Sequence, residues 1–197
     1  MHAQPALFPA DRAVVLNAPI ATARLQLEPL VAAHADELYT LLQDDAIYRW
    51  ISSTKPNSVA ELRTRWERNA TRVSPDGREA WLAWAVRRTS DGVVIGKLDA
   101  NIQPDFVASN VGYVFGAPFW GKGLASEAVT ALTQHLMGQG VTRLVATVTV
   151  GNAASGRVLV KAGFTNARVL SDNDTIRGVL CDDQEYVANA PLCPQST

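Results

Sequence analysis

A glycine-rich turn between an apolar run and an amphipathic run is the segment with the clearest chemical meaning in this sequence. It reads Phe119-Trp120-Gly121-Lys122-Gly123-Leu124-Ala125-Ser126. Where such a turn opens a helix, unpaired backbone N–H groups and the positive end of the helix dipole converge, which suits a phosphate or pyrophosphate. Because the segment supplies no metal ligand and no nucleophile, we interpret it as a cofactor cradle and look for the chemistry elsewhere.

A second polar segment follows the next strand pattern. Asn152 is a natural N-cap for a short helix that ends at Lys161-Ala162, and Gly163 is a natural left-handed C-cap with Phe164 packed behind it. Ser155 stands in the first turn of this helix, where an ordinary serine is common. We interpret Tyr113, in the middle of the strand before the cradle, as a packing residue.

The composition excludes several classes of function. The chain has 197 residues, 47% of them hydrophobic, and a net charge of −1, which is typical of one globular domain and argues against nucleic-acid binding. Two cysteines, Cys181 and Cys193, make no disulfide framework, and the scattered histidines make no zinc pattern. We expect a cytoplasmic protein with no metal and no membrane segment, because no apolar run is long enough to span a bilayer.

The elements that position both motifs follow from hydrophobic periodicity. Ser58 and Glu61 fit a capping box, and Asp91-Gly92 is a hairpin signal. Strands are predicted at 22–30, 81–88, 93–102, 110–116, 143–150, 164–170 and 179–187, and helices at 32–43, 58–73, 123–137 and 152–162. The last two strands are expected to flank a polar turn at Ser171-Asp172-Asn173-Asp174.

This order predicts one α+β domain with a mixed, mostly antiparallel central sheet flanked by helices. The domain is expected over residues 22–188, after an N-terminal arm (1–21) whose order is left open and before a C-terminal tail (189–197). The strand at 110–116, the following helix and the strand at 143–150 form a βαβ unit. Its ligand site is expected at the carboxyl end of the first strand.

Both motifs, in this order, resemble those of the GNAT superfamily of acetyl-CoA-dependent N-acetyltransferases. The superfamily pattern Gln/Arg-x-x-Gly-x-Gly/Ala is matched at Gly123 and Ala125, with Trp120 in place of the first residue. The run from Trp120 to Ala128 is similar to that of the subgroup that acetylates protein N-termini, including those of ribosomal proteins. Asn152-Ala153-Ala154-Ser155 and Lys161-Ala162-Gly163-Phe164 match the second family motif. The resemblance spans residues 22–187.

The resemblance implies a splayed βαβ site for acetyl-CoA, with direct transfer of the acetyl group to a primary amine in a ternary complex. A backbone N–H near Val114 or Phe115 would polarise the thioester carbonyl, and Ser155 would assist the departing thiolate as the catalytic residue. The implied cofactor-binding residues are Val114, Phe115, Trp120, Gly121, Lys122, Gly123, Leu124, Ala125, Ser126, Asn152 and Ser155.

The general base and the acceptor stay open. Many relatives use a tyrosine as the general acid further along the helix at 152–162, where this chain has Val158, Leu159 and Val160. Asn110, on the strand before the cradle, cannot serve as the general base. Glu79, Asp99, Asp105 or water are the candidates. The acceptor is a peptide N-terminus or a small-molecule amine. Residues considered for contact with it are Asp44, Asp45, Tyr48, Trp50 and Trp66.

Two interpretations other than acetyl transfer are also consistent with the sequence. The chain could be a non-catalytic acyl-CoA-binding sensor or assembly module, because no base is obvious. A dinucleotide-binding site is weaker, because Ser126 replaces the third glycine of that motif. A homodimer is left open by the sequence.

Overall fold

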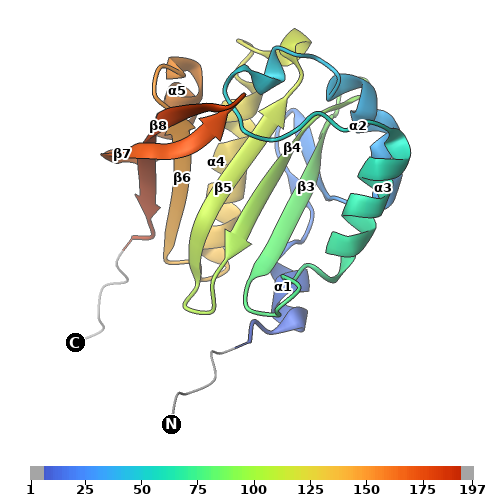
Figure 1. Cartoon of the computed structure of the whole chain (residues 1–197). Helices are drawn as coiled ribbons and strands as arrows, with labels where there is room; N and C mark the ends of the chain where they lie inside the picture. Colours follow the sequence, from blue (N-terminus) through green and yellow to red (C-terminus); the bar gives the residue numbers. More distant parts are fainter. Residues whose placement is uncertain (1–6, 192–197) are drawn as a thin grey trace, which may run out of the picture.

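A meander of three antiparallel strands forms the centre of the computed structural model, which describes residues 7–191 (Figure 1). The strands are β3 (Ala80–Arg88), β4 (Val94–Ile102) and β5 (Val107–Phe115). Gly92 has φ +71° in the hairpin between β3 and β4, a backbone angle that favours glycine and agrees with the predicted Asp-Gly turn.

Five more strands extend the meander within the described residues, in the sheet order β1-β2-β3-β4-β5-β6-β8-β7. β5 and β6 pair in parallel, and the other neighbouring strands pair antiparallel. The predicted mixed, mostly antiparallel sheet is therefore confirmed. The additional strands are β1 (Ile20–Ala21), β2 (Leu25–Pro29), β6 (Arg143–Thr149), β7 (Thr165–Ile176) and β8 (Val179–Asn189).

β5 and β6 separate soon after they pair. In the described chain their register covers Val107 opposite Arg143 and Ala108 opposite Leu144, although β5 continues to Phe115. The two ribbons diverge toward the carboxyl end of β5 (Figure 1). The sheet therefore has an opening between two neighbouring strands, as expected for a splayed βαβ unit.

Helices cover both faces of the sheet. The main core contains residues from α1 (Ala10–Leu16), α4 (Leu124–Gly138) and α5 (Ala153–Lys161). A second core lies on the opposite face, under α2 (Ala35–Leu41) and α3 (Val59–Arg68) (Figure 1). Short 3₁₀ turns complete the elements: η1 (Ala32–His34), η2 (Ile47–Arg49), η3 (Asn69–Thr71) and η4 (Ala117–Phe119).

The N-terminal segment contributes to the main core from residue 8 onward. Phe8, Ala13 and Leu16 are buried, and α1 packs on β3. His2 and Cys193 lie outside the described residues, as do the ends of the expected arm and tail. No helix within residues 7–191 combines the length and the apolar character that crossing a membrane requires.

The predicted turn at residues 171–174 is wrong. β7 runs through this segment, and the chain reverses at Arg177-Gly178, where φ is +52° and +80°. Two successive positive φ values are typical of the two-residue hairpin turn whose twist matches antiparallel strands. The polar residues form a bulge instead: three residues of β7 between Leu170 and Asp174 face one residue of β8.

The capping box predicted at the start of α3 is present in a modified form. Ser58 Oγ accepts a hydrogen bond from the Glu61 N–H at 3.1 Å. The Glu61 carboxylate accepts from the Asn57 N–H at 2.9 Å, one residue before the expected Ser58 N–H. Both interactions fix the start of α3, which lies over β3 and β4.

An ion-pair network joins α2 to the sheet. The Arg87 guanidinium on β3 contacts Glu28 on β2 and Glu37 on α2, each at 2.7 Å. The hydrogen bond from Arg87 holds the pKa of both carboxyls below their ordinary value of 4.5, against the opposing effect of burial. Since the folded pKa is depressed, this stabilisation is complete above pH 4.5 and is lost as the carboxylates are protonated below it.

Arg87→Met should therefore lower stability in a pH-dependent way. We expect the free energy of unfolding to fall by about 1–2 kcal/mol near pH 7, because two charge-assisted pairs are lost at a partly exposed site. Thermal unfolding of both proteins from pH 7 to pH 3.5 checks this result. The difference in Tm should be constant down to about pH 5 and shrink below pH 4.5; an unchanged difference at pH 3.5 would contradict the assignment.

Candidate active site

The loop between β5 and α4 forms a cradle of free backbone N–H groups. Gly121 and Gly123 have φ of +71° and +75°, and Gly123 is the N-cap of α4. This helix end has no side-chain cap. The first-turn N–H groups of Leu124, Ala125 and Ser126 have no partner within the helix and point out of its positive end.

Arg24, which directly precedes β2 in the sequence, holds the loop of the cradle in place. Its Nη1 donates to the Lys122 carbonyl at 3.1 Å, and its Nε lies 2.6 Å from the Glu127 carboxylate. Burial raises the pKa of the Glu127 carboxyl, but hydrogen bonds from Thr22 and Arg24 outweigh this effect and hold the pKa below its ordinary value. Arg24 thus neutralises a carboxylate in the first turn of α4 that would repel an anion there.

Trp120 ties the cradle to the end of β5. The indole Nε1 donates to the Phe115 carbonyl at 2.7 Å, while the side chain is 49% exposed. This contact fixes Trp120 against the end of β5.

Ser155 lies beside a tyrosine from the neighbouring strand. The Asn152 carboxamide caps α5 by accepting the Ser155 N–H at 3.2 Å, as predicted. The Tyr113 hydroxyl lies 2.6 Å from Ser155 Oγ. Burial raises the pKa of Tyr113 to about 12, so its phenol is protonated at neutral pH. The interpretation of Tyr113 as a packing residue missed this contact.

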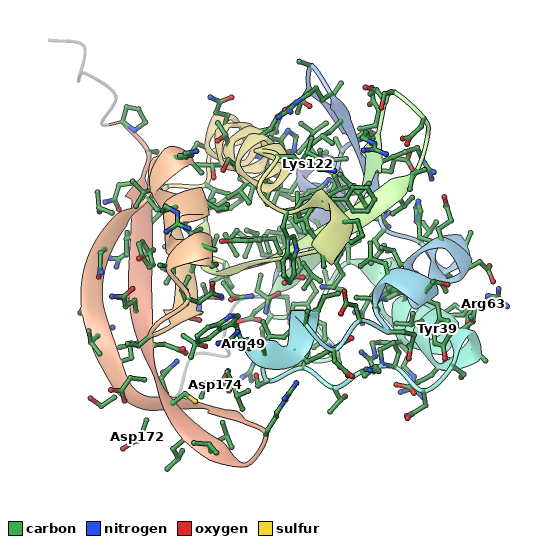
Figure 2. All side chains as sticks on the ribbon, turned by 90° about the horizontal axis from the view of Figure 1, so that it is seen from above. Tyr39, Arg49, Arg63, Lys122, Asp172 and Asp174 are labelled. Atoms are coloured by element: carbon green, nitrogen blue, oxygen red, sulfur yellow. The ribbon has the colours of Figure 1, made fainter. Side chains whose placement is uncertain are left out.

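These elements enclose a cleft of about 430 Å³. Its lining includes every sequence-predicted cofactor residue except Lys122, which is exposed near the start of α4 (Figure 2). Sequence reasoning missed Arg157 and Lys161, two lining residues on α5 that could attract an anion. The predicted residues that line the cleft are Val114, Phe115, Trp120, Gly121, Gly123, Leu124, Ala125, Ser126, Asn152 and Ser155.

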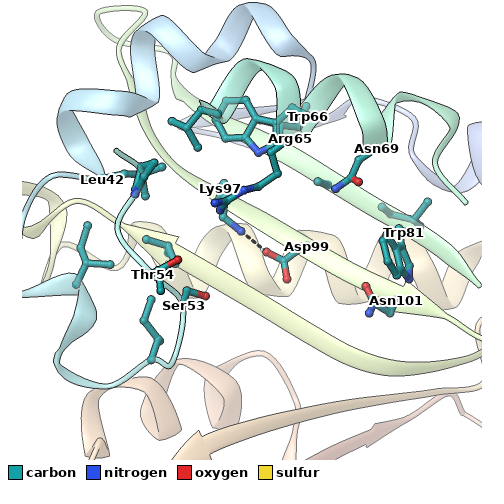
Figure 3. Close-up of a pocket in the computed structure, with 18 of the residues that line it drawn as sticks. Leu42, Ser53, Thr54, Arg65, Trp66, Asn69, Trp81, Lys97, Asp99 and Asn101 are labelled. Carbon is teal, nitrogen blue, oxygen red and sulfur yellow. Dashed lines mark hydrogen bonds and ion pairs between the residues drawn. The ribbon is translucent and has the colours of Figure 1, made fainter. Parts of the chain in front are cut away.

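A second cavity, of about 350 Å³, adjoins the cleft and lies between the sheet, the helix α3 and the segment 47–56 (Figure 3). Ile47, Ile51 and Val114 line both spaces. We call this second space the α3 cavity. The end of β5 therefore stands where the two spaces meet.

The residues that we considered for contact with the acceptor line different cavities, and two of them line neither. Tyr48 and Trp66 line the α3 cavity, and Trp50 lines the cleft. Asp44 and Asp45 line neither: Asp44 accepts the Ala46 N–H at 2.9 Å, and Asp45 pairs with Lys55.

One of the three carboxylates proposed as general base lines the α3 cavity. Asp99 lies on β4 and contacts Lys97 Nζ at 2.5 Å. Glu79 accepts from the Trp81 indole at 3.1 Å, and Asp105 accepts from the Val107 N–H at 3.1 Å, both near the opposite end of the meander. Among residues 7–191, no group of three or more His, Cys, Asp or Glu side chains is arranged to hold a metal ion.

Comparison with known proteins agrees with this architecture. The sequence pattern of the acetyltransferase (GNAT) domain matches residues 24–165. The chain is 28% identical over 163 residues to the uncharacterized N-acetyltransferase p20 of Bacillus licheniformis, covering 82% of this chain and 90% of that protein.

Two solved structures share the fold at low sequence identity. The ribosomal L7/L12 alpha-N-protein acetyltransferase RimL, in complex with coenzyme A, has a TM-score of 0.78 and 22% identity, covering 87% of this chain and 98% of that one. The microcin C7 self-immunity acetyltransferase MccE, in complex with acetyl-CoA and AMP, has a TM-score of 0.75 and 22% identity, covering 85% and 93%. The chain belongs to the acetyltransferase (GNAT) domain family and is an acetyltransferase.

Proposed function

We propose that the protein transfers the acetyl group of acetyl-CoA directly to a primary amine, with both substrates bound together. The meeting of two cavities at Val114 carries this proposal. One cavity has the backbone donors that a pyrophosphate needs, and the other leads to the same point from the opposite face of the sheet. The amine is that of a peptide N-terminus or of a small molecule.

We assign the cradle to the pyrophosphate of acetyl-CoA. The N–H groups from Gly121 to Ser126 supply donors, and Lys122 supplies an N–H and a nearby charge. The pantetheine arm, which resembles a peptide, would lie along the free edge of β5 near Phe115. Asn152 would donate a hydrogen bond to it, and Trp120 would hold the loop in place.

The Phe115 N–H is the best placed oxyanion donor. Backbone groups alternate along a strand, and the Gly116 N–H donates to Ile95 on β4 at 3.1 Å. The Phe115 N–H therefore points the other way, into the opening between β5 and β6. Of the two positions named from the sequence, Val114 and Phe115, we thus favour Phe115 as the donor to the developing oxyanion.

Ser155 would protonate the departing thiolate. The Tyr113 phenol stays protonated and has two acceptors, the Ser155 carbonyl at 3.0 Å and Ser155 Oγ at 2.6 Å. When it donates to Ser155 Oγ, the serine hydrogen is left for the sulfur. Asp99, the candidate base that lines the α3 cavity, would receive the amine proton directly or through water. No covalent enzyme intermediate is needed.

Two measurements test the proposal. Isothermal titration calorimetry should give a Kd for acetyl-CoA in the micromolar range, and no binding at millimolar ligand would end it. Release of free thiol should rise when a panel of primary amines is added. A protein that binds acetyl-CoA but releases no thiol with any amine would be the non-catalytic sensor or assembly module.

A further inference from the structure

The α3 cavity is a trough that follows one face of β4. Lys97, Asp99 and Asn101 alternate along this strand and line the trough, and Trp66 and Trp81 flank it (Figure 3). A strand rises about 3.3–3.4 Å per residue, so the trough extends about 13 Å from Lys97 to Asn101. Lys97 pairs with Val114 across the strands, which places that end beside the cofactor cleft.

The charges that line this trough are mostly positive. Arg65, Arg72 and Lys97 line it together with a single carboxylate, Asp99. Asp99 is already paired with Lys97, and Arg65 is paired with Glu61 at 2.7 Å. Arg72 has no carboxylate within ion-pair distance among residues 7–191.

Arg72 is also held in position. Its Nε donates to Asn17 Oδ1 at 2.7 Å, and its Nη1 donates to the Ala70 carbonyl at 3.0 Å. Asn17 is 3% exposed and is fixed in turn by a hydrogen bond to the Ala83 carbonyl at 3.0 Å. A guanidinium anchored by a buried amide loses little side-chain entropy when it binds an anion.

Arg72 lies at the end of the trough remote from the cofactor cleft. The Arg72 carbonyl accepts the Trp81 N–H at 2.8 Å, and Trp81 pairs with Asn101 across the strands. An acceptor that places its amine near Val114 and extends along β4 toward the Arg72 end of the trough would therefore span about 10–13 Å. Trp66 and Leu62, which also line the trough, favour an apolar middle.

We propose that the acceptor is an amine with a carboxylate or phosphate at its far end, and that Arg72 binds this anionic group. This inference rests on the proposed function. A tripeptide with a free carboxyl end has this length, because an extended chain spans about 3.3–3.6 Å per residue. Polyamines and aminoglycosides fit poorly, because their extra cations would meet Arg65, Arg72 and Lys97.

Rates of thiol release at saturating acetyl-CoA test this inference. The probes are the tripeptide Ala-Phe-Ala, its C-terminal amide, Ala-Phe-phosphoserine amide and spermidine. We expect kcat/KM to be about tenfold or more higher for a probe with an anionic end than for Ala-Phe-Ala amide. The free acid and the phosphoserine probe distinguish carboxylate from phosphate as the preferred anion.

Variants locate the effect. Arg72→Gln should raise KM for the preferred anionic probe about tenfold and leave the amide unchanged, and Arg72→Lys should recover part of the loss. Arg63→Gln is the control: Arg63 lies on α3, pairs with Asp36 and, unlike Arg72, does not line the trough (Figure 2). An unchanged Kd for acetyl-CoA verifies that each variant is folded.

The outcomes separate the two proposals. Equal or faster use of the amide or of spermidine by the native protein overturns the anionic acceptor and leaves amine acetylation intact, whatever Arg72 variants do. An unchanged KM in Arg72→Gln removes Arg72 as the anion site. If no amine releases thiol although acetyl-CoA binds, the proposed function itself fails.

Discussion

Replacing Gly123 with valine is expected to abolish acetyl-CoA binding while the chain stays folded. Gly123 has φ +75° and caps α4, so its peptide must point N–H groups outward for the cradle to work. A β-branched residue resists this backbone angle and adds a side chain where the pyrophosphate would approach. Loss of about two charge-assisted hydrogen bonds, each worth about 1.5–3 kcal/mol, predicts an affinity at least about 100-fold lower by calorimetry.

The free protein can accommodate the added side chain. A Cβ built on Gly123 comes no closer than 3.6 Å to its nearest neighbour, Arg24 Nη2, which is an ordinary contact. Destabilisation should therefore be limited to backbone strain of about 1–3 kcal/mol. Thermal unfolding followed by circular dichroism measures this cost separately from binding.

Gly92→Val provides a matched control. Gly92 has φ +71° and open space around its Cβ position, but it lies in the β3–β4 hairpin and lines neither cavity. Both variants should lose similar stability, and Gly92→Val should keep its affinity for acetyl-CoA. Undiminished binding by Gly123→Val would refute the cradle as the anion site.

Local sequence patterns were sufficient to predict the loop and the helix starts that form this site. The turn around Gly121 and Gly123 and the cap at Asn152 each depend on a few consecutive residues, so their geometry can be read from types and spacing. The element order then places both motifs at the carboxyl end of β5, and the divergence of β5 and β6 agrees with that expectation.

Contacts between distant segments were not predictable in the same way. Arg24 reaches the cradle from a residue 98 positions before Lys122, and Tyr113 reaches Ser155 across 42 residues. Asn17 fixes Arg72 from a helix in the N-terminal arm. A single sequence does not indicate which side chains such elements bring together, because the register of the strands and the packing of α1 determine these pairs.

The polar run in β7 shows a different kind of failure. Asp172 and its neighbours have the composition of a turn, yet they form a bulge, because Arg177-Gly178 supplies two positive φ values a few residues later. Two turn signals within one hairpin compete, and the tighter two-residue reversal lets β7 and β8 pair over a longer stretch. Polar composition alone does not separate a reversal from a bulge.

The positive charge of the α3 cavity bears on how the amine reaches the thioester. Arg65 and Lys97 should disfavour a protonated amine near Val114, so the amine would arrive in its neutral, nucleophilic form or lose its proton early. Asp99, which is paired with Lys97, can accept that proton. The same charges that would select an anionic acceptor therefore also favour the reactive state of its amine.

Ser155→Ala is expected to lower kcat about 100-fold while leaving the Kd of acetyl-CoA nearly unchanged, because a general acid contributes about 10²–10⁴ to a rate. The substitution should leave the backbone of α5 unchanged. The cap of α5 uses the backbone N–H of Ser155, which alanine keeps, so the helix should start at the same residue. Single-turnover thiol release and calorimetry on the same samples separate the chemical step from binding.

Tyr113→Phe distinguishes proton donation by Ser155 from a purely structural role. If Tyr113 donates to Ser155 Oγ, its loss should lower kcat by about tenfold, less than the loss of Ser155 itself, and the double variant should be no slower than Ser155→Ala. Because the pKa of Tyr113 is raised to about 12, its ionisation should not reduce the native rate below about pH 10. Additive losses in the double variant, or a kcat for Ser155→Ala within about threefold of native, would show that the thiolate leaves without this pair.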